Sequence, residues 1–149
     1  MMGWFRGNTA PVPVQLAPQS VTDRYRAHLD TLAAASRQAS AVISPAAFST
    51  LRRIDDRMRP LIDDLEGRDI LPEHEVAIDH FIATFVPDTL NLFLGLPAAD
   101  QRHGGRGDTM LCEQLLALEQ RARDFGDTMR TDALQAMTTN GFFLEQALR

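Results

Sequence analysis

The chain has 149 residues, of which 44% are hydrophobic and 23% are charged, and its formal net charge is −5. This composition is typical of one folded domain that buries about two-thirds of its surface, and it excludes a disordered polar chain. All fifteen basic residues are arginines, and they are dispersed among twenty acids. Because a nucleic-acid binder carries a basic patch or stripe, we predict that nucleic acid is not a partner.

Residues 1–19 are predicted to form a flexible tail, because they contain three prolines and two glycines. Trp4 and Phe5 stand beside Arg6 in this tail, a combination that can touch a partner or a membrane interface. The single cysteine and the lack of a signal-peptide pattern favour a cytoplasmic location. Peripheral attachment to the inner face of the membrane is left open.

Residues 20–149 are predicted to be a single all-α domain, an antiparallel bundle of about four helices. Ser20 and the pair Ser44-Pro45 are typical of the starts of the first and second helices. Gly67 is typical of the end of the second helix. Pro60 lies inside that helix and predicts a bend or one missing hydrogen bond.

A third helix is predicted to begin at Pro72, and it is apolar on nearly all sides, as a central buried helix is. Pro87 is expected to divide it into two helices, with Asp88 near the start of the second. An acid and an asparagine (Asp88 and Asn91) near the middle of the apolar stretch argue against a membrane span. Residues 97–107 contain three glycines and are expected to form a flexible loop.

From Asp108 or Thr109 onward the pattern is that of one long helix. Its apolar positions first follow the heptad spacing of a coiled coil, at Leu111, Leu115, Leu118, Ala122, Phe125 and Met129. After Met129 the best stripe moves sideways, to Leu134, Met137, Gly141, Leu144 and Leu148. This shift predicts that the helix passes from one neighbour to another, or that it breaks near Asn140-Gly141.

No catalytic, cofactor-binding or metal-binding constellation can be recognised. The candidates for a metal at the start of the third helix have poor spacing for ligands: His74, Glu75, Asp79 and His80. The acids of the second helix alternate with arginines and are interpreted as a salt-bridged face: Asp55, Asp56, Asp63 and Asp64. Cys112 is interpreted as a small core residue, and the glycines before Asp108 as a linker. We therefore predict a chain that is not an enzyme and needs no cofactor.

Three short segments resemble a known bacterial family. They are Phe85-Val86-Pro87-Asp88-Thr89-Leu90 with Phe93 and Leu94, then Leu115-Leu116-Ala117-Leu118-Glu119, and finally Asn140-Gly141-Phe142-Phe143-Leu144-Glu145. Over residues 75–148 the sequence is similar to the bromo-chloroindolyl-phosphate hydrolysis family, which is related to the tellurite (toxic-anion) resistance proteins, and to small actinobacterial relatives. The resemblance implies a helical protein linked to envelope or stress physiology, with no catalytic residue to carry over.

The leading hypothesis is a non-catalytic helical interaction module that associates with itself or docks a helix of a protein partner. Its candidate partner-binding residues are Leu111, Leu115, Leu118, Phe125, Met129, Trp4 and Phe5. The same heptad positions can instead serve only the chain's own core. Two alternatives remain: a peripheral membrane-associated stress protein that uses the aromatic tail, and a metal-dependent phosphate-ester hydrolase that uses the paired acids of the second helix.

Overall fold

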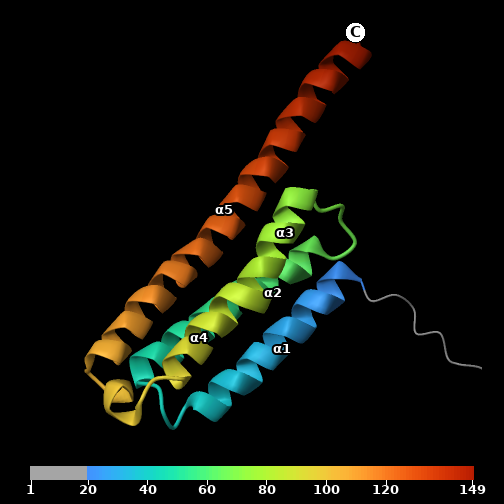
Figure 1. The fold of residues 1–149 in the computed structure, drawn as a ribbon. Coiled ribbons are helices and arrows are strands. Elements are labelled where there is room, and N and C mark those ends of the chain that lie inside the picture. The colour runs from blue at the N-terminus through green and yellow to red at the C-terminus, as the bar shows by residue number, and fades with distance from the viewer. Residues whose placement is uncertain (1–19) are drawn as a thin grey trace, which may run out of the picture.

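The computed structural model describes residues 20–149, and every regular element in that range is helical (Figure 1). In chain order the elements are α1 (Val21–Ala39), α2 (Pro45–Leu65), α3 (Pro72–His80), η1 (Phe81–Phe85), α4 (Val86–Leu94), η2 (Ala98–Gln101) and α5 (Arg106–Ala147). The predicted all-α bundle with a long C-terminal helix is confirmed. Trp4 and Phe5 of the predicted tail lie outside the described residues.

The first two helices begin, and the second ends, where the local sequence predicted. The Ser20 hydroxyl accepts a hydrogen bond from the N–H of Asp23 at 3.1 Å, and the Ser44 hydroxyl accepts one from Ala47 at 3.3 Å. Each bond satisfies an N–H that the first turn of a helix leaves without a partner. Gly67, just beyond α2, has a φ of 72°, in the left-handed region that glycine adopts without a steric penalty.

The segments α3, η1 and α4 stack end to end as one rod (Figure 1). Pro87 lacks an N–H, and in a regular α-helix its ring collides with the carbonyl of the residue four positions earlier. Here the preceding turn widens into a π turn, in which the N–H of Val86 bonds to the carbonyl of Phe81. The expected division at Pro87 is therefore a change of hydrogen bonding inside a continuous rod, with Asp88 in the first turn of α4.

Successive helices run in opposite directions, and their order around the bundle follows from their contacts. α2 packs against α1 and α5, and the rod packs against the same two helices from the other side. α2 and the rod therefore occupy opposite corners. Because α2 and α5 both run upward in Figure 1, they are parallel neighbours: Ser44 lies beside Cys112, and Arg53 lies beside Glu119.

α1, α2, the rod and α5 all contribute buried side chains to one core. Tyr25 of α1 is fully buried, and its hydroxyl donates a hydrogen bond to the carbonyl of Glu75 at 3.0 Å. Burial, together with the nearby Glu75 charge, raises the pKa of Tyr25 to about 12. Phe81 of the rod meets Phe125 of α5 edge to face, with the ring centroids 5.4 Å apart. Aliphatic residues fill most of the remainder.

The connection before α5 is packed against the bundle, which corrects the expectation of a simple flexible loop. It contains the short helix η2, and α5 begins at Arg106, slightly earlier than predicted. Gly107 is buried there, and a Cβ atom on it would lie 2.2 Å from the carbonyl oxygen of Asp100. Only glycine fits this close approach of two backbones.

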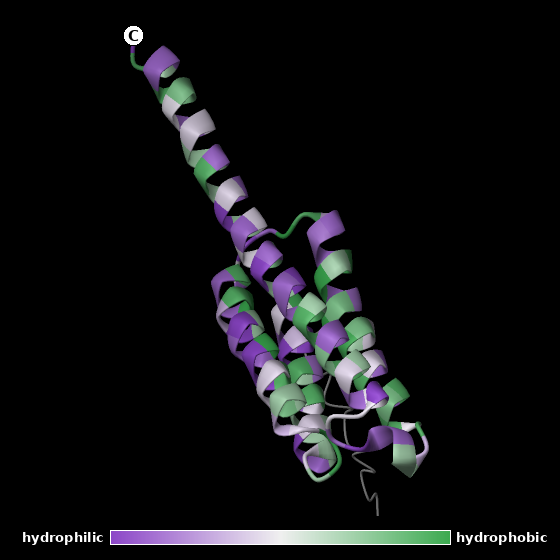
Figure 2. Cartoon of the chain, turned by 90° about the vertical axis from the view of Figure 1, so that its left-hand side faces the viewer, coloured by the Kyte–Doolittle hydropathy of each residue, from purple (hydrophilic) through white to green (hydrophobic). Residues whose placement is uncertain are grey.

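α5 runs unbroken from Arg106 to Ala147, so the possible break at Asn140-Gly141 is absent. Its last side chain packed against the core is Met129, and the last contact with the rod joins His74 Nε2 to Asp132 Oδ2 at 3.7 Å. We call residues 133–149 the projecting segment. Figures 1 and 2 show that it extends beyond the other helices. At about 1.5 Å per residue its helical part is roughly 22 Å long.

Candidate interaction surface

The heptad residues of α5 face the chain's own core. Leu111, Leu115 and Phe125 are no more than 5% exposed, and Leu118 and Met129 are half-buried against the same cluster. Their neighbours in the bundle are α2 and the rod. A partner could reach Leu111, Leu115 and Phe125 only if the bundle opened, so the large apolar surface that is accessible in the folded chain lies elsewhere.

The projecting segment is where large apolar side chains are exposed together. Every residue from 130 to 149 is exposed. The exposed fractions of its large apolar side chains range from 43% for Leu144 to 82% for Leu148, and the others are Leu134, Met137, Phe142 and Phe143. Figure 2 shows hydrophobic residues interleaved with polar ones along this part of α5.

These side chains are arranged as an amphipathic helix. Successive steps of three and four residues place Leu134, Met137, Gly141, Leu144 and Leu148 on one line, which we call the apolar stripe. Alanines at 133, 136 and 147, together with Phe143, extend the same half of the helix. The opposite half carries threonines, glutamines and Glu145, with Phe142 among them.

The apolar stripe continues the side of α5 that faces α2. At 100° per residue it lies on the line through Glu119 and Arg123, roughly a quarter turn from the core-facing positions. Glu119 pairs with α2, and Arg123 lines a hollow with Arg57 and Pro60 of α2. Pro60 and Gly126 both line that hollow, so they lie at about the same height in the bundle. α2 continues five residues beyond Pro60 and ends at Leu65, which therefore lies about level with residue 131 of the parallel helix α5. Beyond that level the stripe has no neighbour within residues 20–149.

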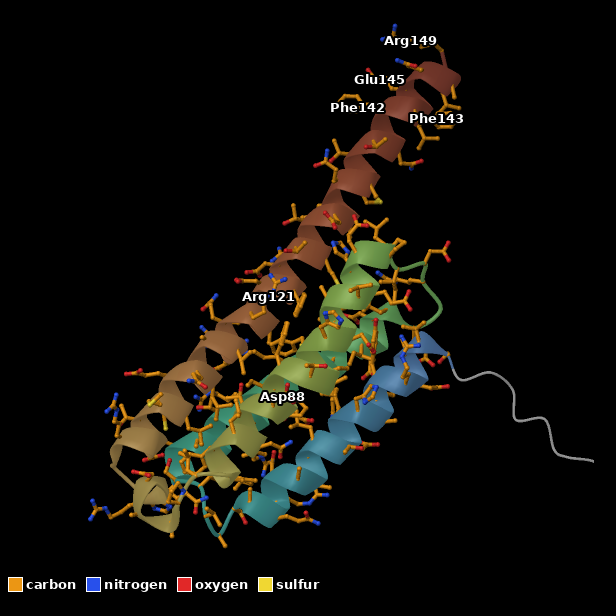
Figure 3. All side chains as sticks on the ribbon, viewed as in Figure 1. Asp88, Arg121, Phe142, Phe143, Glu145 and Arg149 are labelled. Carbon is orange, nitrogen blue, oxygen red and sulfur yellow. The ribbon has the colours of Figure 1, made fainter. Side chains whose placement is uncertain are left out.

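Few charges interrupt the projecting segment. Figure 3 shows Glu145 and Arg149 at its far end together with Phe142 and Phe143, well away from Arg121 on the packed part of α5. Arg149 and Glu145 are 4.0 Å apart, and no other charged residue occurs after Asp132. A helix with so little charge and so much exposed apolar surface is typical of an element that is covered by a partner.

A buried ionic cluster fixes α5 to α2 below this segment. Glu119 is 4% exposed, and its Oε1 atom lies 3.0 Å from Arg53 Nε, 3.4 Å from Arg123 Nη2 and 3.5 Å from Arg57 Nε. Burial acts to raise the pKa of Glu119, but the ion pairs with the arginines outweigh it and the pKa is lowered. The sequence pattern does not reveal this cluster, because Glu119 lies between two apolar heptad positions and a charged residue there is typical of an exposed helix face.

Cys112 and Asp108 form a second polar group at the start of α5. The thiol of Cys112 donates to Asp108 Oδ1 at 3.6 Å, and Asp108 Oδ2 accepts the N–H of Gly104 at 2.8 Å. Burial, with the nearby Asp108 carboxylate, raises the pKa of the Cys112 thiol. The environment therefore favours the neutral thiol over a reactive thiolate.

The paired acids of α2 do not converge. Asp55 Oδ2 accepts from Arg59 Nε at 2.8 Å, and Asp63 Oδ1 accepts from Arg26 Nη2 at 3.0 Å. Asp55 and Asp56 do line a hollow of about 190 Å³ between α1 and α2, and Asp55 Oδ1 is buried with no hydrogen-bond partner among residues 20–149. Among residues 20–149 no group of three histidine, cysteine or acidic side chains is placed to hold a metal ion.

Two acids of α3 are likewise engaged in ion pairs. Arg24 Nη2 lies 3.3 Å from Glu75 Oε1, and Arg24 Nε lies 3.4 Å from Asp79 Oδ1. These bonds attach α1 to α3. Separately, within the described range no helix combines the length and the apolar composition needed to cross a membrane.

A smaller apolar surface lies at the opposite end of the bundle. Between α4 and α5, a groove of about 210 Å³ is lined mainly by apolar atoms, with Leu92, Leu96 and Met110 among its residues. Leu92 is 74% exposed. This groove is short, and the projecting segment presents more exposed apolar side chains along one line.

The sequence located the apolar stripe but not its accessibility. The sideways shift after Met129 suggested a new neighbour within the chain, whereas the structure shows that the stripe extends past the last one. No protein-family model, curated protein or solved structure matches the chain, and the resemblance of residues 75–148 to the bacterial phosphate-hydrolysis and tellurite-resistance family therefore stays a prediction.

Proposed function

We propose that the chain is a non-catalytic helical interaction module and that the projecting segment is its docking element. The observation that carries this proposal is the apolar stripe, exposed along a helix that leaves the bundle after Asp132. An isolated helix of this length is marginal in water, because most helical stability comes from packing of the apolar face. A partner that covers the stripe supplies that packing.

A protein partner suits the segment better than a lipid surface. Helices that lie in a membrane interface carry lysine or arginine along their polar face. The polar half of the projecting segment has mainly threonine and glutamine, with Arg149 as its one cation. The peripheral-membrane alternative therefore depends on the tail with Trp4 and Phe5. The hydrolase alternative depends on four acids of α2, of which Asp55 and Asp63 already bind arginines.

Photo-cross-linking in cells that express the chain tests this proposal. A photoreactive phenylalanine analogue replaces Leu144 on the apolar stripe, and in a matched variant it replaces Gln135 on the polar half. We expect discrete adducts, identified by mass spectrometry, from position 144 and far fewer from position 135. Equal labelling at both positions, or no adduct at 144, would exclude the projecting segment as the docking element.

A further inference from the structure

Resting on the proposed function, we infer that the partner of the projecting segment is a second copy of the same chain. Two projecting segments pack antiparallel, with a two-fold axis near Gly141, and the two bundles lie at opposite ends of the dimer. Four observations carry this inference: the spacing of the apolar stripe, the position of α2, the charges at the end of α2, and the length of the segment.

The apolar stripe is self-complementary when read in the opposite direction. Its large side chains lie seven and four residues before Gly141, and three and seven residues after it. An antiparallel partner with its Gly141 opposite Gly141 therefore places Leu134 opposite Leu148, and Met137 within one residue of the level of Leu144. Gly141 has open space where a Cβ would be, so two helix backbones can approach closely at the axis. Such matching is what an isologous interface requires.

The position of α2 excludes the parallel arrangement. α2 packs against the same side of α5 that carries the apolar stripe, but it reaches only to the level of residue 131. Two α5 helices packed in parallel through their stripes would be about 8–10 Å apart, which leaves no room for the two α2 helices between them. In the antiparallel arrangement the projecting segment of the second copy ends just beyond the C-terminal end of α2. The two helices then lie end to end along the same side of α5.

Charges at the C-terminal end of α2, where the second copy's helix would end, also favour the antiparallel arrangement. The last turn of α2 carries Asp63 and Asp64, followed by Glu66, and the C-terminal end of a helix is itself negative. Arg26 already pairs with Asp63 and Glu66, whereas Asp64 has no ion pair within residues 20–149. The antiparallel register places Arg149 of the second copy about level with residue 133, beside this acidic end.

The length of the segment sets the strength of the dimer. An apolar stripe about 22 Å long belongs to the small interfaces below about 1,200 Å², which form weak or transient complexes. We therefore expect a reversible dimer whose population depends on protein concentration.

Sedimentation analysis of the purified full chain tests the choice of partner. We expect the mass to rise from monomer to dimer with concentration. Leu144→Glu should weaken the dimer at least about tenfold, because it buries an unpaired charge in the interface. Gln135→Glu adds the same charge to the polar half of the same segment and should leave the dimer unchanged. Both sites are exposed, and circular dichroism verifies that both variants stay folded.

Cysteine cross-linking tests the direction of the two helices in a Cys112→Ser background. Gly141→Cys should form a covalent dimer, because the two-fold axis brings both copies of position 141 together. Leu148→Cys should not, because the two copies of that position lie about 21 Å apart along the axis. Cross-linking at both positions would overturn the antiparallel order.

The two proposals fail in different ways. A chain that sediments as a monomer at all concentrations, or a Leu144→Glu variant that dimerises like the unmodified chain, overturns self-association through the stripe. In the second case the groove between α4 and α5 becomes the interface to examine. If position 144 then cross-links to a different protein in cells, the docking element is retained and only the identity of the partner changes.

Discussion

At the scale of single residues, Glu119 shows how a charged side chain enters an apolar interface. Its carboxylate takes the place of a core residue between α2 and α5, and it is tolerated because three half-exposed arginines surround it. Loss of the negative charge leaves those arginines to repel one another beside a buried amide or acid. The cluster therefore stabilises the packing of α2 against α5 only while Glu119 is ionised.

Replacing Glu119 by glutamine should lower the free energy of unfolding at pH 7 by about 1–3 kcal/mol. The pKa of Glu119 in the folded chain is below its ordinary value of 4.5, so the unfolded chain binds the proton more readily. The stabilisation is therefore complete well above pH 4.5 and is lost as the pH falls through the folded pKa. Chemical unfolding at a series of pH values should show a smaller acid-induced loss for Glu119→Gln than for the unmodified chain.

Glu113→Gln is the matched control, because Glu113 is an exposed residue of the same helix. It should leave both the stability at pH 7 and its pH dependence unchanged. Identical pH profiles for Glu119→Gln and the unmodified chain would show that the cluster contributes nothing measurable.

Glycine substitutions give a second residue-scale prediction. Gly107→Ala should destabilise the chain by about 1–3 kcal/mol, because its Cβ would lie 2.2 Å from the carbonyl oxygen of Asp100. Gly126→Ala, in the same helix with nothing within 4 Å of the new Cβ, should stabilise it by about 0.5–1 kcal/mol. Thermal unfolding of the two variants should therefore shift in opposite directions; shifts in the same direction would contradict the packing at η2.

Helix ends and helix faces were predictable because their causes are local. Ser20 and Ser44 cap their own first turns, and the heptad pattern of α5 follows from the period of the helix itself. The π turn before Pro87 and the close approach at Gly107 were not predictable. The first depends on the rod remaining packed on both α1 and α5, and the second depends on a carbonyl seven residues earlier in the folded chain.

The candidate surface was likewise predictable only in part. The apolar stripe was visible in the spacing after Met129, because amphipathicity is a property of one helix. Whether a helical face is covered depends on how long its neighbours are, and sequence spacing does not reveal that α2 ends level with residue 131. For this reason the spacing alone indicates the heptad residues as partner-binding candidates, although in the structure they pack in the chain's own core.

At the scale of elements, α5 consists of a part packed in the bundle and an exposed part. Its first part supplies core residues up to Met129, and the projecting segment supplies none. A chain that ends after Asp132 should therefore unfold cooperatively with a free energy within about 0.5 kcal/mol of the full chain, measured below the concentration at which dimers form. Its helical signal should fall by the contribution of the missing turns.

A longer truncation provides the contrast. A chain that ends after Leu118 also loses Ala122 and Phe125, and with them the edge-to-face contact to Phe81. We expect it not to fold cooperatively, because an unfilled space remains between α2 and the rod. Equal stability of both truncated chains would contradict the division of α5 at Asp132.

At the scale of the whole molecule, the structure combines a well-packed bundle with a helix that lacks tertiary support. The bundle is held by one continuous core and by ion pairs that join α1 to α2, α1 to α3 and α2 to α5. The projecting segment has no such contacts within residues 20–149. In the proposed dimer the same contacts would bury the apolar stripe and stabilise its helix.

This coupling of burial to helix stability predicts a local response to protein concentration. In hydrogen–deuterium exchange, amides of residues 133–147 should exchange quickly in dilute solution, because a helix without packing opens readily. As the concentration rises through the dimer range their protection should increase, since binding to the helical form stabilises it by mass action. Amides in the centre of α2 should be protected at every concentration. In Leu144→Glu the segment should exchange quickly throughout, and protection that rises with concentration in this variant would show that the stripe is not what the second copy covers.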